Sequence, residues 1–148
     1  MRFIFDDSVY ADMLEGGLTV LADANYPASG SYIDVSEFES FVFLVGLDTI
    51  ATPDFAVKQD TSATETASIK AVTGASKTDV VTGDDGKWFS IEVETAKLDI
   101  ANGFRYVTLT VSGTGGSDNA NIWFLGRNPR RAPVTQPANY LEAVVVAG

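Results

Sequence analysis

Apolar and polar residues alternate in short runs along most of the chain, and glycine, asparagine, aspartate and threonine separate the runs. Residues 87–94 and 104–112 carry an apolar side chain at every second position, a period that is typical of β-strands with one buried face. Residues 41–47 (FVFLVGL) are instead apolar throughout, which indicates a central strand that is covered on both faces.

These runs predict an all-β protein. About eight strands are expected, at residues 31–35, 41–47, 54–59, 67–72, 87–94, 104–112, 122–125 and 143–146. Short strands between turns are typical of an antiparallel β-sandwich or a partly closed barrel, of the β-tulip or jelly-roll kind. The turn-forming residues of 82–86 and the polar loop 113–121 each predict a hairpin connection.

The inward-facing positions of these strands predict the core. It is expected to contain Phe41, Phe43, Val45, Phe55, Val57, Phe89, Ile91, Val93, Val107, Leu109, Val111 and Phe124.

The length of 148 residues fits one domain, and the two ends differ from its middle. We expect an N-terminal arm at 1–17, where residues 7–14 also fit a short helix, and a β-sandwich domain at 18–126. Residues 127–148 begin with a stretch rich in proline and arginine, which favours an extended C-terminal arm.

Composition narrows the function. The chain has no cysteine and no histidine, which excludes disulfides, zinc fingers, thiol nucleophiles and histidine-based catalysis. We therefore expect a protein that is not an enzyme and that uses no cofactor or metal. The net charge of −10 argues against binding to nucleic acid or to an anionic membrane. No apolar run reaches the roughly 18 residues of a membrane span, and the N-terminus lacks a signal peptide, so we expect synthesis in a cytoplasm.

Known motifs mostly fail on this chain. The acidic and glycine-rich stretches match neither a calcium-binding EF-hand nor a dinucleotide fingerprint. Glu92 and Glu94 are expected on one strand face with Trp88. Three interpretations stay open for them: a solvent-facing surface, a carboxylate pair of a hydrolase, and a carbohydrate platform.

The order of several segments resembles small structural proteins of tailed bacteriophages. The resemblance spans roughly residues 30–134 and is carried by 32–35 (YIDV), 39–46 (ESFVFLVG), 57–60 (VKQD), 104–111 (FRYVTLTV) and 123–134 (WFLGRNPRRAPV). It implies a head decoration or cement protein in the virion, which binds the outer surface of the capsid lattice, has the major capsid protein as its partner, and self-associates, with a trimer favoured.

The two arms are expected to make the partner contacts. The candidate residues are Phe3, Phe5, Tyr10 and Leu14 as apolar anchors, Arg127, Arg130 and Arg131 for ion pairs, and Tyr140 for packing together with 144–146. The alternative is a carbohydrate-binding or adhesin-like module that uses Trp88, Trp123 and the loop 113–121. A carboxylate-based hydrolase ranks last.

Overall fold

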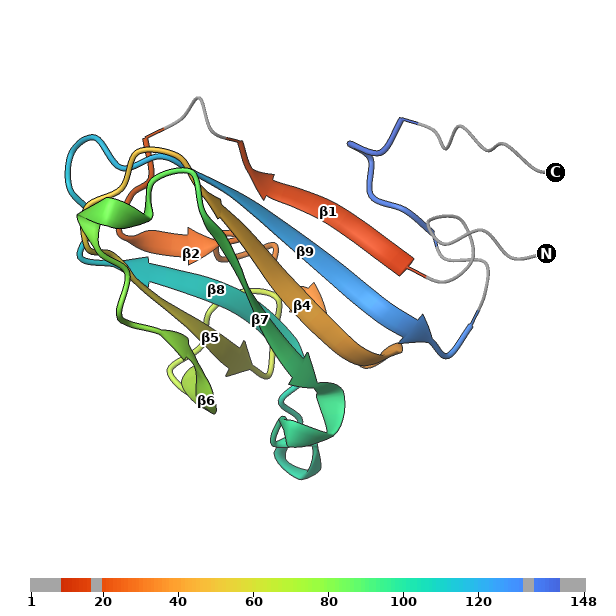
Figure 1. Ribbon diagram of the computed structural model, residues 1–148. Helices are drawn as coiled ribbons and strands as arrows, with labels where there is room; N and C mark the ends of the chain where they lie inside the picture. Colours follow the sequence, from red (N-terminus) through yellow and green to blue (C-terminus); the bar gives the residue numbers. More distant parts are fainter. Residues whose placement is uncertain (1–8, 17–19, 132–134, 142–148) are drawn as a thin grey trace, which may run out of the picture.

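The computed structural model describes residues 9–16, 20–131 and 135–141, and they form a sandwich of two antiparallel sheets (Figure 1). The first sheet has the order β1 (Val9–Glu15), β9 (Ala120–Pro129), β4 (Phe38–Leu47) and β7 (Trp88–Glu94). The second has the order β2 (Ala24–Tyr26), β8 (Tyr106–Ser112), β5 (Asp54–Asp60) and β6 (Lys70–Lys77), and β3 (Ile33–Asp34) also pairs with β8. The predicted all-β sandwich is confirmed, and the described strands close no barrel.

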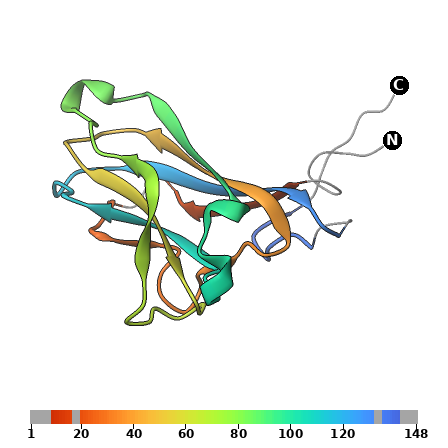
Figure 2. The same ribbon diagram turned by 90° about the horizontal axis from the view of Figure 1, so that it is seen from below.

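The strand order is that of a jelly roll. The chain passes to the opposite sheet after β1, β3, β4, β6, β7 and β8, and it stays in one sheet from β2 to β3 and from β5 to β6. This pattern is two Greek keys wound around one core, and Figure 2 shows the two sheets as facing layers. Of the predicted architectures, the chain therefore adopts the jelly roll.

Two connections differ from the sequence-based prediction. Residues 82–86 contain a 3-10 helix, η2 (Thr82–Asp84), and lead from β6 to β7. Residues 113–119 lead from β8 to β9. Each connection joins strands of opposite sheets, so neither is the predicted hairpin. Turn-forming residues show where a strand ends, but they do not determine which sheet the next strand joins.

The core lies between the two sheets and agrees closely with the prediction. Eleven of the twelve predicted core residues are buried, and the twelfth, Phe89, is half-buried against Phe55 with ring centroids 5.1 Å apart. The sequence pattern missed buried residues in turns and at strand ends, among them Leu21, Val35, Phe38, Ile50, Val80, Leu98 and Ile122.

The predicted N-terminal arm and short helix are wrong for residues 9–15, which form β1. This strand pairs with β9 along its length and so extends the first sheet. The Tyr10 ring lies 5.7 Å from Phe38 and 5.9 Å from Phe124, measured between centroids. Leu14 also packs against the core. Burial of these side chains within the sheet outweighs any local tendency to form a helix.

The predicted C-terminal arm begins too early. Strand β9 continues to Pro129, which pairs with Phe38, so Arg127 belongs to the sheet. Residues 135–141 lie outside the strands and run beside β1 (Figure 1). The Gln136 side chain donates to the Val9 carbonyl at 2.7 Å and accepts from the Ala11 N–H at 3.2 Å. It therefore satisfies backbone groups at the open edge of β1, as a neighbouring strand would.

Candidate functional site

The outer face of the first sheet carries several exposed apolar side chains. Pairing places Met13 beside Trp123, Trp123 beside Leu44, and Leu44 beside Ser90. The next row contains Ala11, Leu125, Val42 and Glu92. These positions alternate with the core positions along each strand, so their side chains point away from the core, although Ala11 and Val42 are only 8% and 7% exposed. We call this surface, with Arg127, Glu94 and Trp88 at its margins, the β9 face.

Several large apolar side chains of the β9 face are accessible to solvent. The exposed fraction is 46% for Met13, 38% for Trp123 and 71% for Trp88. Leu141, from the segment beside β1, is 94% exposed and lines a shallow apolar hollow of about 330 Å³ with Met13 and Trp123. A contiguous apolar surface of this kind marks an interaction site more often than a solvated face.

The opposite outer face of the sandwich is polar. Strand β8 presents Tyr106, Thr108 and Thr110 there, and the side chain of Asn25 accepts a hydrogen bond from Thr110 at 2.6 Å. Asn25 and Tyr32 both donate to the Glu65 carboxylate, at 2.8 and 2.6 Å. Burial and this carboxylate raise the pKa of Tyr32. The network ties a surface loop to the sheet.

The charges on the β9 face are separated by strand. Arg127 stands on β9, and its row continues through Ser40 of β4 to Glu94 of β7. Glu92 lies two residues before Glu94 on the same face of β7. None of these three side chains makes an ion pair within the described part of the chain. The face therefore has an apolar centre, a positive margin on one strand and a negative margin two strands away.

The other two arginines of the predicted cluster follow the end of β9. Arg130 and Arg131 are exposed, and the described residues give their guanidinium groups no ion pair. Other cations of the chain are paired: Lys70 with Asp99, Lys77 with Asp79, Lys87 with Asp84, and Arg105 with Asp34. Among the described residues Lys58 and Lys97 also lack an ion pair, but each stands alone in the sequence.

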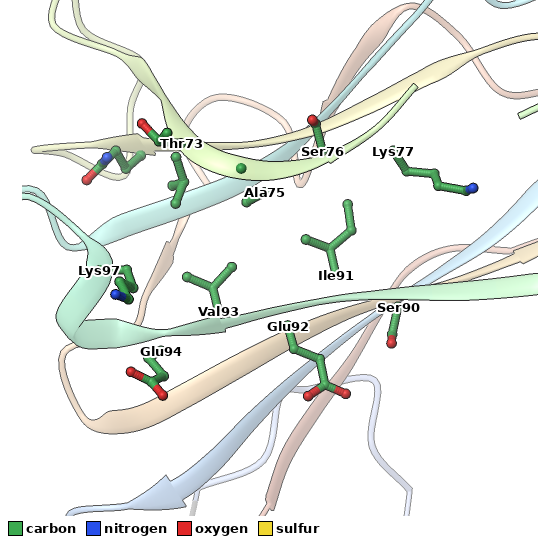
Figure 3. Close-up of a pocket in the computed structure, with 13 residues that line it drawn as sticks. Thr73, Ala75, Ser76, Lys77, Ser90, Ile91, Glu92, Val93, Glu94 and Lys97 are labelled. Carbon is green, nitrogen blue, oxygen red and sulfur yellow. The ribbon is translucent and has the colours of Figure 1, made fainter. Parts of the chain in front are cut away.

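A cleft of about 770 Å³ opens between the edge strands β6 and β7 (Figure 3). Ile91 and Val93 point into it from β7, and Val72 and Ala75 line it from β6. Glu92 and Glu94 point to the other side of β7, as Figure 3 shows, which confirms that the two carboxylates share the outer face. The β7 wall of the cleft is therefore formed by the apolar side chains of Ile91 and Val93, and the two carboxylates of β7 point away from it.

The buried carboxylates hold loops in place. Asp60 is fully buried and accepts hydrogen bonds from the Thr61 N–H at 2.6 Å and the Thr66 N–H at 2.7 Å. Burial alone would raise the pKa of Asp60, but these hydrogen bonds outweigh it and lower the pKa. Asp118, which is 2% exposed, accepts from the Ala51 N–H at 2.7 Å and the Gly115 N–H at 2.8 Å.

The loop 113–121 is consequently pinned at several points. Besides the bonds to Asp118, the Thr114 N–H and hydroxyl donate to Asp23 at 2.8 Å. These bonds lower the pKa of Asp23. The predicted surface loop is thus a tightly held connection between the two sheets.

The described residues contain neither a metal-binding cluster nor a membrane-spanning helix. Residues 9–16, 20–131 and 135–141 contain no group of three acidic side chains arranged to hold a metal ion. The same residues contain no helix with the length and apolar character needed to cross a membrane.

The predicted partner-binding residues fall into four groups. Phe3, Phe5 and 144–146 lie outside the described residues. Tyr10 and Leu14 pack on the core, and burial followed by the nearby Asp12 carboxylate raises the pKa of Tyr10 to about 12. Arg127, Arg130 and Arg131 are exposed, and Tyr140 lines the apolar hollow.

The sequence analysis missed Met13 and Leu44 as surface residues and Gln136 as an edge cap. Alternation along β1 would have placed Met13 opposite to Tyr10 and Leu14 had residues 7–14 been interpreted as a strand. No family model, curated protein or solved structure matches this chain.

Proposed function

We propose that this protein is a structural protein of a phage virion that binds the outer surface of the capsid lattice, with the major capsid protein as its partner. The observation that carries the proposal is the pair Arg130 and Arg131. These exposed cations stand together at the end of β9 in a chain of net charge −10, without an ion pair among the described residues. Such a pair suits an acidic surface on another protein.

The fold supports this proposal. The jelly roll is a recurrent architecture of viral capsid domains, and it is also found in lectins and enzymes. Its rigid sandwich presents Arg130 and Arg131 beyond a strand that is held on both sides by β1 and β4. Such a platform would position the two cations against many equivalent sites of a lattice, where repeated weak contacts give firm attachment.

Co-sedimentation with empty capsids of the phage that encodes the chain tests the proposal. The variant R130A/R131A should weaken capsid binding about 2- to 30-fold, as expected for the loss of two exposed ion pairs. The matched control is K58A/K97A, which removes the same charge from two isolated and unpaired lysines. The proposal fails if the parent chain does not bind capsids, or if the control weakens binding as much as the arginine variant.

The second candidate is a carbohydrate-binding module. The observation that favours it is that Trp88 and Trp123 both point outward from the first sheet and are 71% and 38% exposed. Flat aromatic side chains on a sheet can stack against sugar rings. Binding to a glycan array that is lost in W88A, with no affinity for capsids, would favour this function over the first.

A further inference from the structure

We infer that the β9 face is the site at which two copies of this chain pair, sheet against sheet, around a two-fold axis. The composition of the face is the first observation. Its accessible residues include Met13, Trp123, Trp88 and Arg127, and these residue types are enriched in protein interfaces, whereas lysine is depleted there. The strands of the face contribute no lysine to it.

The arrangement of charges selects a second copy as the occupant. A two-fold interface brings the same patch together twice, so it must be complementary to itself. Consider an axis that runs parallel to β9 and β4 and lies between them. Rotation about it places β9 of one copy opposite β4 of the other, with each row of residues at the same level.

At that level the contacts are complementary. Trp123 of one copy lies opposite Leu44 of the other, and Leu125 lies opposite Val42, because the two residues of each pair are neighbours within one sheet. Arg127 lies opposite Ser40, and the strand beyond Ser40 carries Glu94. The long arginine side chain can therefore reach the Glu94 carboxylate of the second copy, and the symmetric pair forms at the same time.

The charged residues are available for these pairs. Within one copy Arg127 and Glu94 are separated by two strand spacings, about 10 Å, and neither makes an ion pair in the described part of the chain. Two aligned sheets pack about 10 Å apart. The side chains of two facing sheets point toward each other, so an arginine and a glutamate side chain can together span this gap between the copies.

The size of the face sets the strength of the association. Four strands of about five residues cover roughly 20 Å by 20 Å, so two copies bury about 800 Å² in total, which is below the roughly 1,000 Å² of a stable specific interface and belongs to weak, transient association. We therefore expect a dimer with a dissociation constant in the micromolar range.

Sedimentation velocity of the full chain between about 1 and 200 µM tests the pairing. The parent chain should shift from monomer to dimer over this range. Both R127E and E94R should weaken the dimer at least roughly 10-fold, because each puts like charges together at two symmetric positions. The double variant R127E/E94R should restore it to within about threefold of the parent.

Two further variants complete the test. K58E carries the same charge change as R127E but lies on the opposite outer face, so it should leave the dimer intact. W123Q should weaken the dimer while circular dichroism shows an unchanged fold. The inference is overturned if the parent stays monomeric over the whole range or forms a trimer. It is equally overturned if the double variant does not regain association, or if W123Q loses binding to a glycan while the parent is a monomer.

Discussion

Gly126 offers the sharpest test of the packing at the end of the core. It lies on β9, between Tyr10 of β1 and Phe41 of β4, and the ring of Phe38 covers it. A Cβ atom added at Gly126 would be 2.8 Å from three carbon atoms of that ring. Carbon atoms in contact are ordinarily about 3.5–4.0 Å apart. The substitution Gly126→Ala therefore forces either the ring or the strand to move.

The cost of that movement can be estimated. Overpacking of a buried site costs about 1–3 kcal/mol, and replacing glycine with alanine at a compatible backbone conformation returns about 0.4–1 kcal/mol by restricting the unfolded chain. With the middle of each range, Gly126→Ala should therefore lower the free energy of unfolding by about 1.3 kcal/mol, with an upper limit of about 2.6 kcal/mol. For a domain of this size the melting temperature falls by about 2–4 °C per kcal/mol, and thermal unfolding followed by circular dichroism measures the shift.

Two variants separate the clash from other effects. Gly46→Ala is the matched control, because Gly46 lies in the adjacent strand β4 and an added Cβ would meet only the Asn121 Cβ at 3.9 Å, an ordinary contact. It should leave the stability unchanged or raise it by up to about 1 kcal/mol, because it restricts the unfolded chain without a clash. In a Phe38→Leu background the cost of Gly126→Ala should largely disappear. An equal cost in both backgrounds, or no cost at all, would refute the proposed role of the Phe38 ring.

Two other predictions concern Asp60 and Gln136. Asp60→Asn should lower the free energy of unfolding by about 1.5–3 kcal/mol at pH 7, because an amide cannot accept the full set of hydrogen bonds. The pKa of Asp60 is lowered in the folded chain, so its ionised carboxylate stabilises the fold above about pH 4, and this stabilisation is lost as the pH falls. Urea titrations should therefore show a smaller acid-induced loss of stability in the Asp60→Asn variant than in the parent. Gln136→Ala should accelerate hydrogen exchange at the Ala11 amide by removing its partner; exchange at an unchanged rate would contradict the capping of β1.

The sequence predicted the class of fold and eleven of the 22 buried core residues, because alternation reports directly which side of a strand is buried. Phe41, Phe43 and Val45 illustrate this, since their spacing alone places them on one face. The alternation could not show which sheet each strand joins, so the connections 82–86 and 113–121 were misassigned as hairpins. Pairing between strands distant in sequence decides that question.

The ends of the chain were predicted less well for a related reason. Residues 9–15 combine two acids and one aromatic residue with aliphatic ones, so their pattern fits several local structures. Only the pairing with β9 distinguishes between these structures. Tyr10 and Leu14 were expected to bind a partner because they would be costly to expose. That argument was sound, but the partner that covers them is the core of the same chain.

The edges of the two sheets explain why association would use a face rather than an edge. Exposed edge strands pair readily with other chains unless something blocks them. Gln136 covers part of the β1 edge, and β6 is interrupted by an irregular register, with Gly74 in a left-handed conformation. The carboxylates of Glu92 and Glu94 flank the β7 edge. The edges of the described sheets are thus protected against backbone pairing with other chains, which does not depend on side-chain identity. The β9 face, in contrast, keeps Trp123 and Met13 accessible. A contact made through that face requires matching side chains and charges, so it can be specific to one partner.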